Sequence, residues 1–590
     1  MKFSDEVTFV MTIVGVLTIW HYLTGIRNNS EMNLSVLISG VMLCSISMAL
    51  TFYVVVRRGK ASVFALLSLL VLSYGLVTIY TFRYDALGGP DVIGEFAIAS
   101  ETYSKARWPI ASQFLGTGDR AGRYASCLSV TILPAVLSKV TGLSVLDIFR
   151  YVMPSFGASV PILLFLVVKK VFNDERLAFL SALLLALSHL QIFMLSYMNR
   201  EQVTNLFLML SILMAIKPTQ AQKMRNNTYP VITLVFLLSV VLSADGHAAS
   251  DISLLVFVGF AVAPIFLKIR RKRLDTKYLF AGYFGFLALC QVAWMYFVSP
   301  IKYNQYLEIV PRIFNSLSLY LPNYLHRVST TGQFLPSSSA LQGGIPTSRV
   351  LGYWYYLSVI ISGVGLLYAL FRYQKDSRRT GIIVGGLLLF LAFGFSILAT
   401  PIISELDPGR IFAEPFFYLF TAFTICIFCR RTLNRGPSRL LIVIPMIFIV
   451  ASLPMNLSLP DSYRILHYNT ENSVAPEYRA TYFATTYSDL LFCRWLQSYV
   501  SPSLWISVDL KGYDIGYLAG HVNQTYQTYP RFSPLSELLI VPENYLLYDL
   551  WVIPNPYSIF PSQNVSVNEL YSNASLIRSD GNTFMLKAFP

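Results

Sequence analysis

Two carboxylates, Asp91 and Glu95, lie four residues apart in a segment that begins Gly88-Gly89-Pro90. The glycines interrupt the preceding apolar run, and a proline suits the first turn of a new helix. Residues i and i+4 share one face of a helix, so the spacing predicts that the two carboxylates point the same way. Such a pair can supply a general base and its partner, or bind a divalent cation such as Mg²⁺ or Mn²⁺. The alternative is that these acids only complement the dipole of their own helix.

Two further groups of ionisable residues fall beside apolar runs. Arg200 and Glu201 could pair with each other, or they could place a phosphate-binding guanidinium next to an acid. Asp245 and His247 follow a long apolar run, where ionisable side chains are costly enough to be functional candidates. A tight turn explains Asp245 equally well.

The last group comprises Glu405 and Arg410. Arg410 directly precedes another apolar run, so it could contact a lipid phosphate or simply extend its charged end to the membrane surface. The sequence contains no Walker phosphate loop, no H-E-x-x-H motif and no G-x-S-x-G motif. These absences argue against ATP-driven work, metalloprotease chemistry and serine-hydrolase chemistry.

These residues are positioned by a chain that is mostly apolar. Hydrophobic residues make up 55% of it and charged residues 13%. Runs of about 20 apolar residues match the thickness of a bilayer, and in lipid such runs satisfy their backbone only as helices. The pattern predicts an all-α polytopic membrane protein with about thirteen spans, at 7–24, 34–56, 61–82, 152–168, 177–195, 202–216, 231–248, 251–267, 278–298, 351–371, 381–399, 412–429 and 440–457.

The net charge of +14 is a topology signal rather than a nucleic-acid footprint. About half of the 45 basic residues lie in six short segments on one side of the predicted spans. The positive-inside rule makes that side cytoplasmic. We therefore expect a plasma-membrane protein with a cytoplasmic N-terminus and an extracellular C-terminal domain. The basic segments are 57–60, 169–176, 217–225, 268–277, 372–379 and 430–439.

The requirement that the basic segments share one side also decides whether the segment 126–141 crosses the membrane. If it crossed the membrane, the later basic segments would lie outside, so we expect a short juxtamembrane helix on the outer face. The membrane module then covers 1–457, with outer loops at 83–125 and 299–350. The tail, 458–590, contains short β-branched or aromatic runs at 504–508, 550–553 and 583–589 and a helical pattern at 490–499. These runs predict a small external α/β domain.

One family pattern runs through five stretches, Thr131 to Leu143, Phe149 to Pro154, 164–172, 178–188 and Asn199-Arg200-Glu201. Together these stretches resemble the N-terminal half of the GT-C glycosyltransferases. The resemblance is strongest over about residues 80–215, is weaker over 571–586, and is closest to archaeal members whose first outer loop carries a D-x-x-x-E-like element. These enzymes take sugars from polyprenyl-phosphate or polyprenyl-diphosphate carriers.

The resemblance implies roles for individual residues. In the family, an acid of the first outer loop deprotonates the acceptor or coordinates the metal; here that position is Asp91, with Glu95 as its partner. Relatives similar to oligosaccharyltransferases carry a second acidic element, often D-x-D, which only Glu201 matches in part. This departure puts strict metal dependence in doubt. The W-W-D-Y-G motif of the oligosaccharyltransferases is absent.

We therefore expect a hexosyltransferase of the GT-C type that works with inversion at the outer face. The expected donor is a polyprenyl- or dolichyl-phosphate sugar, and the acceptor a protein or a lipid-linked glycan. Arg200 and Arg410 are expected to bind the lipid phosphate, because the departing phosphate is anionic. The rival hypothesis is a polytopic transporter or lipid-sugar flippase, although the repeated halves typical of many transporters are not evident.

Overall fold

The computed structural model describes most of the helical part of the chain and short stretches of the tail. The described residues are 5–27, 33–83, 87–88, 90–108, 124–188, 199–216, 228–244, 256–263, 279–300, 303–304, 307, 311, 349–372, 377–399, 415–433, 443–456, 484–485, 506–508, 524–526, 538–542, 574–579 and 583–588.

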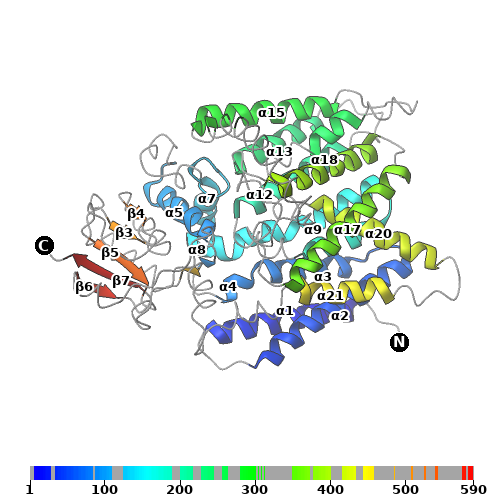
Figure 1. Ribbon diagram of the computed structural model, residues 1–590, viewed down its shortest axis with the longest axis horizontal. Helices are drawn as coiled ribbons and strands as arrows, with labels where there is room; N and C mark the ends of the chain where they lie inside the picture. Colours follow the sequence, from blue (N-terminus) through cyan, green and yellow to red (C-terminus); the bar gives the residue numbers. More distant parts are fainter. Residues whose placement is uncertain are drawn as a thin grey trace, which may run out of the picture.

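Helices dominate the part of the chain before the tail (Figure 1). Up to residue 216 they are α1 (Asp5–Arg27), α2 (Leu34–Arg58), α3 (Val63–Val77), α4 (Ile79–Arg83), α5 (Pro90–Lys105), α7 (Ile132–Thr141), α8 (Val145–Asp147), the π-helix η2 (Ile148–Val152), α9 (Met153–Phe172), α10 (Glu175–Ala186) and α12 (Asn199–Ile216). Beyond it they are α13 (Thr228–Ala244), α15 (Leu279–Val298), α17 (Arg349–Arg372), α18 (Ser377–Ala399), α20 (Pro415–Leu433) and α21 (Val443–Asn456).

Each of the thirteen apolar segments overlaps a described helix, the eighth of them over residues 256–263. Three described stretches are long and apolar enough to cross a membrane: Asp5–Gly25, Leu34–Arg58 and Val145–Phe172. Apolar helices of this length support a membrane protein. The number of crossings and their direction stay predictions.

The third of these stretches is built around a proline. Pro154 has no N–H, so the carbonyl of Arg150, four residues earlier, lacks its usual helical donor. The Thr81 hydroxyl donates to that carbonyl at 3.1 Å, and the Tyr74 hydroxyl donates to the Tyr151 carbonyl at 3.0 Å. The π-turn of η2 lies at this point and joins α8 to α9. α3 and α4 are thereby tied to the start of α9.

The helix predicted over 126–141 begins later, at Ile132. Residues before it bond to α13 instead of continuing the helix: the Leu128 N–H donates to the Leu242 carbonyl at 2.8 Å, and the Ser129 hydroxyl donates to the Ser243 carbonyl at 2.6 Å. α7 itself is amphipathic, with Pro134 and Ala135 buried and Val136 and Val140 50% and 78% exposed. An exposed apolar edge of this kind suits the predicted juxtamembrane position.

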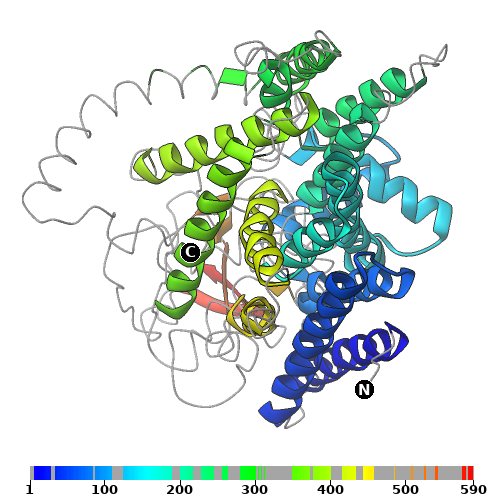
Figure 2. The ribbon, with the colours of Figure 1, turned by 90° about the vertical axis from the view of Figure 1, so that its right-hand side faces the viewer.

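Seen from the end at which α1 begins, α1 and α2 lie at one edge of the helical bundle and α15 at the opposite edge (Figure 2). α1 and α2 approach closely because glycines face each other. A Cβ on Gly15 would lie 2.6 Å from the Cys44 Sγ, and one on Gly40 would lie 3.0 Å from the Gly15 carbonyl oxygen. Helices that pack this tightly form a rigid part of the bundle.

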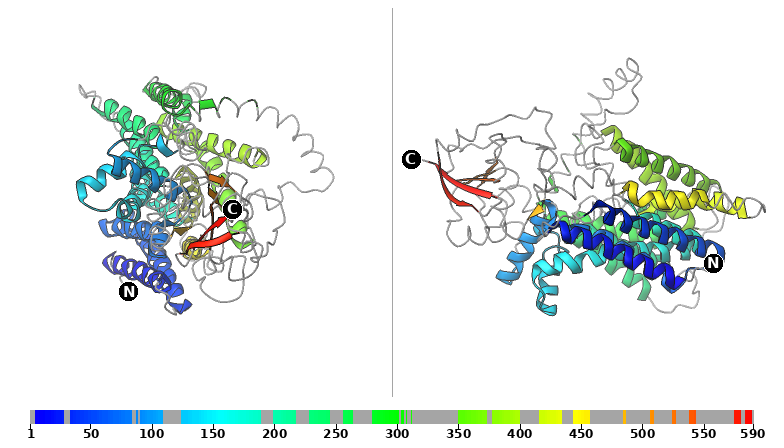
Figure 3. Two further views of the ribbon diagram at one scale, coloured as in Figure 1. Left: turned by 90° about the vertical axis from the view of Figure 1, so that its left-hand side faces the viewer. Right: turned by 90° about the horizontal axis from the view of Figure 1, so that it is seen from below.

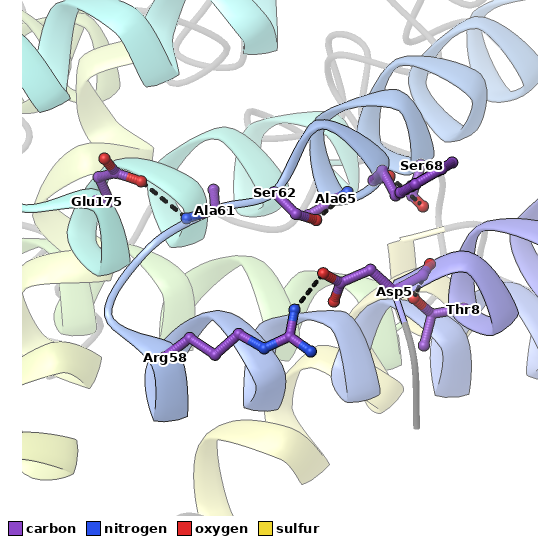
Figure 4. A network of polar contacts seen from close by, with 9 residues as sticks. Asp5, Thr8, Arg58, Ala61, Ser62, Ala65, Ser68 and Glu175 are labelled. Atoms are coloured by element: carbon purple, nitrogen blue, oxygen red, sulfur yellow. Dashed lines mark hydrogen bonds and ion pairs between the residues drawn. The ribbon is translucent and has the colours of Figure 1, made fainter. Parts of the chain in front are cut away.

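A polar network ties the four-residue turn between α2 and α3 to its neighbours (Figure 4). Arg58 pairs with Asp5 at the start of α1. Glu175, at the start of α10, accepts from the Ala61 N–H at 2.8 Å and pairs with Lys169 Nζ at 2.8 Å. Partial burial acts to raise the pKa of Glu175, but the Lys169 and Ala61 hydrogen bonds and the charges of Lys169 and Lys60 together lower it.

The tail contributes a five-stranded mixed sheet in the order β4-β3-β5-β7-β6. Its strands are β3 (Ile506–Val508), β4 (Gln524–Tyr526), β5 (Leu538–Pro542), β6 (Ala574–Ser579) and β7 (Thr583–Ala588). β3 is parallel to β4 and β5, while β7 is antiparallel to β5 and β6. The strands predicted at 504–508 and 583–589 are confirmed as β3 and β7. The predicted strand 550–553 and helix 490–499 lie outside the described residues.

The sheet lies beyond the end of the bundle opposite to the N-terminus (Figures 1 and 3). A two-residue strand of the tail, β2 (Ala484–Thr485), also reaches the segment between α4 and α5. It pairs antiparallel with β1 (Leu87–Gly88), so that Leu87 faces Thr485 and Gly88 faces Ala484. The tail is thus joined to the segment that leads into α5.

Candidate functional site

A new helix starts where the Gly-Gly-Pro pattern predicts one. α4 ends at Arg83, and α5 begins at Pro90. Asp91 is therefore in the first turn of α5, four residues before Glu95. Leu87, in β1, is 4% exposed and belongs to the same apolar cluster as Val92. The strand pair and this cluster fix the start of the helix that carries both acids.

Glu95 is held by the first turn of α12. Its Oε1 lies 2.5 Å from Nη1 of Arg200, and its Oε2 accepts from the Asn199 N–H at 3.1 Å. Glu95 is 0% and Arg200 1% exposed, so this ion pair is fully removed from water. The N–H groups at the start of a helix have no partner within that helix and carry its positive dipole end. Glu95 thus caps α12 rather than serving the dipole of its own helix.

An aromatic ring closes this ion pair on one side. The Arg200 Cζ lies 5.0 Å from the centroid of the Tyr124 ring, a cation–π contact. The same ring packs against Gly94, since a Cβ there would lie 2.6 Å from the Tyr124 Cε2. Any larger residue at 94 would displace the ring. Gly94 therefore allows α5 to approach the Tyr124 ring and Arg200 together.

The next residues of α12 are also buried. Gln202 donates from Nε2 to the Asn199 Oδ1 at 3.2 Å. A Cβ on Gly157 of α9 would lie 3.1 Å from the Gln202 Cγ, so α9 and α12 meet closely here. Glu201 is 7% exposed, and Asn205, one turn further, is 5% exposed. The start of α12 is a buried polar layer, whereas the rest of the helix is apolar.

The structure thus brings together Glu95 and Arg200, and it places Glu201 next to them in sequence on α12. Asp91 lies on α5 one turn before Glu95, and its side chain is outside the description. Four other predicted site residues lie outside the described residues: Asp245, His247, Glu405 and Arg410. The sequence-based roles of all these residues stay predictions.

Sequence reasoning missed Tyr124 and Gly94. Nothing in the spacing of a long loop marks Tyr124 as a partner of Arg200. Gly94 lies between the two acids, and a glycine inside a predicted helix is a signal of close approach that could have been used. The contact with α12 depends on tertiary packing and has no sequence signature of its own.

Both oxygens of Glu95 have partners, on Arg200 and on the Asn199 N–H. Within the described ranges, no group of three His, Cys, Asp or Glu side chains could hold a metal ion. The cation predicted for Asp91 and Glu201 stays a prediction.

Similarity to known proteins is found among solved structures. No protein-family model matches the chain, and no curated protein matches it. Solved structures do. The archaeal oligosaccharyltransferase AglB from Archaeoglobus fulgidus, in complex with an inhibitory peptide and a dolichol-phosphate, is 13% identical, with a TM-score of 0.47 over 81% of this chain and 69% of that one. ArnT from Cupriavidus metallidurans, bound to undecaprenyl phosphate, is 12% identical, with a TM-score of 0.39 over 90% and 99%.

A third neighbour is the arabinofuranosyltransferase AftD from Mycobacteria, 11% identical, with a TM-score of 0.47 over 88% of this chain and 40% of that one. These neighbours are GT-C glycosyltransferases.

Proposed function

We propose that this chain is a membrane glycosyltransferase of the GT-C type. It would move a sugar from a polyprenyl-phosphate carrier to an acceptor at the outer face, with inversion at the anomeric carbon. The proposed donor class is that of the lipid phosphates bound to AglB and ArnT. The acceptor would be a protein or a lipid-linked glycan.

One observation carries the proposal: the buried contact between Glu95 of α5 and the first turn of α12. The contact joins the two segments in which the sequence resemblance places the acidic elements. It fixes α5, and so the helical turn that carries Asp91, at the end of the bundle next to the sheet (Figure 1). A reaction between a lipid-linked donor and an external acceptor requires a site where the membrane meets the aqueous phase, as expected at an end of the helical bundle.

In this proposal the residues have different roles in the transfer. Asp91 takes the proton of the acceptor nucleophile as it attacks the anomeric carbon, and the lipid phosphate leaves with the bonding electrons. Glu95 and Arg200 hold α5 against α12 and so position Asp91. They take no direct part in the transfer, because their charges already neutralise each other. Positive charge near the departing phosphate stabilises it. Arg410 is the predicted cation for that task, and Glu201 a predicted assistant of the base.

A flippase would use the same lipid but transfer no sugar. Reconstitution of the protein in liposomes can therefore distinguish the two activities. The full-length chain is placed in liposomes with a radiolabelled polyprenyl-phosphate hexose and a mixture of peptide and glycolipid acceptors. Label in an acceptor supports the proposal. Label that stays on the polyprenyl phosphate while moving between leaflets, with no labelled acceptor, overturns it in favour of a flippase.

A further inference from the structure

Two tryptophans from distant parts of the chain stack beside the site. Trp108 follows the end of α5, and Trp294 belongs to the last two turns of α15. Their ring centroids are 6.1 Å apart, and their planes differ by 10°. Ala106, between α5 and Trp108, has a φ of 48°. This left-handed turn is unfavourable for a residue other than glycine, so the placement of Trp108 is enforced by its surroundings.

Each indole also donates a hydrogen bond, and the two acceptors are consecutive carbonyls. The Trp108 Nε1–H donates to the Ala125 carbonyl at 2.7 Å, and the Trp294 Nε1–H donates to the Ser126 carbonyl at 3.3 Å. Stacking and hydrogen bonding together thus fix the backbone of residues 125 and 126 between α5 and α15. We name Trp108 and Trp294 the tryptophan clamp.

The residue held next to the clamp is Tyr124, whose ring covers Arg200 and packs on Gly94. A continuous series of contacts therefore runs from α15, through Trp294 and the Ser126 carbonyl, to Tyr124 and the Glu95–Arg200 ion pair. Cation–π contacts weaken when the ring moves off the cation, so the position of Tyr124 bears directly on Arg200.

We propose that the tryptophan clamp positions the reaction site: Trp108 and Trp294 fix Tyr124 on Arg200, and Arg200 in turn fixes Glu95 and the helix of Asp91. The inference rests on the proposed function for its catalytic consequence but not for its structural part. α15 lies at the edge of the bundle opposite to α1 and α2 (Figure 2). The clamp makes it a part of the site, although no described ionisable residue of α15 takes part.

The chain offers a matched control in Trp20. Its Nε1–H donates to the Gly75 carbonyl at 3.1 Å, and its ring stacks on Phe82 with centroids 4.3 Å apart. Trp20 has the same kind of bond and the same kind of ring contact as a clamp residue, but it joins α1 to α3 and α4. A change that only weakens packing should affect both positions alike.

The test compares Trp108→Phe, Trp294→Phe and Trp20→Phe in the full-length chain. Each removes one N–H···O bond and keeps an aromatic ring. We expect kcat for sugar transfer to fall about three- to tenfold in the clamp variants, the effect of one hydrogen bond, with little change in the KM for the donor. Trp20→Phe should lower the unfolding temperature by a similar amount and leave kcat unchanged. Equal kcat in all three variants would overturn the proposal.

If the wild-type chain transfers no sugar, the proposed function fails, and the clamp is judged by unfolding alone. Tyr124→Leu is combined with Trp294→Phe and, separately, with Trp20→Phe. Residues in one contact network give non-additive effects, and distant residues give additive ones. The shifts in unfolding temperature should be non-additive for Trp294 and additive for Trp20. Additive shifts in both pairs would show that Tyr124 does not depend on the clamp.

Discussion

Glu95 and Arg200, 105 residues apart in sequence, form an ion pair in which both side chains are almost completely buried. Glu95 also accepts the N–H of Asn199, so one carboxylate joins α5 to the start of α12. The pair is a strong constraint because neither group can lose its partner without leaving a charge in a dry environment. The account of the site depends on this junction.

The first prediction concerns the ion pair. Glu95→Gln should destabilise the chain by about 3–5 kcal/mol, because it leaves Arg200 buried without a counter-charge. The double variant Glu95→Leu with Arg200→Met should recover most of that stability, since it removes both charges. Thermal unfolding in one detergent measures both. Glu101→Gln on the same helix is the control, because Glu101 pairs with Lys105 at the surface. A Glu95→Gln variant as stable as Glu101→Gln would contradict the account.

The second prediction concerns pH and Glu175. Burial acts to raise the pKa of Glu175 in the folded chain. The hydrogen bonds from Lys169 and from the Ala61 N–H outweigh this effect and lower the pKa below its ordinary value of 4.5. A carboxylate whose pKa is lowered by folding stabilises the folded chain at pH values above its ordinary pKa. This stabilisation is lost as the pH falls through the pKa of the carboxylate in the folded chain. The stability difference between the wild type and Glu175→Gln should therefore be constant above about pH 5 and shrink below it. Lys169→Met should weaken this pH dependence. A difference that stays constant into strong acid would refute the assignment.

The third prediction concerns the contact between the tail and the first outer loop. Cysteines at directly opposed positions of an antiparallel pair lie within disulfide distance. Leu87→Cys with Thr485→Cys should therefore cross-link on mild oxidation, as read by mass spectrometry of a digest. Leu87→Cys with Ser507→Cys, which pairs the same loop position with a residue of β3, is the control. Cross-linking in the control pair alone would mean that the tail docks elsewhere.

Some features of the site can be predicted from the sequence, and others, even at neighbouring residues, cannot. Gly88-Gly89-Pro90 predicts the start of α5 correctly because backbone preferences act locally. The i, i+4 spacing of Asp91 and Glu95 is likewise a local property. The partner of Glu95 is not, because two helices far apart in sequence meet there. Adjacent residues on a helix point about 100° apart, so the Arg200-Glu201 dipeptide alone does not tell which of the two faces α5.

The same limit applies to 126–141. Its apolar composition and length favour a helix throughout, yet the backbone of Leu128 and the hydroxyl of Ser129 bond to the end of α13. Those competing acceptors are a tertiary feature. The helix therefore begins at Ile132, and the preceding turns carry Tyr124, the Ala125 and Ser126 carbonyls and hence the clamp contacts.

The fourth prediction concerns α7. Its exposed residue Val140 should contact the outer leaflet if the helix lies along the membrane surface. A nitroxide attached at Val140→Cys should collide more often with oxygen, which concentrates in lipid, than with a water-soluble nickel complex. A nitroxide at Ser104→Cys, on the exposed part of α5, is the reference. A label at 140 as accessible to nickel as the one at 104 would place α7 in water.

The central claim, that Asp91 is the base of a sugar transfer, has one direct measurement. Asp91→Asn keeps the size of the side chain and removes its basicity. Its kcat for transfer from a polyprenyl-phosphate hexose should fall about 100-fold or more, as expected when a general base is lost. Glu101→Gln, ten residues along the same helix, should transfer at the wild-type rate. Transfer by Asp91→Asn at the rate of Glu101→Gln would contradict the claim.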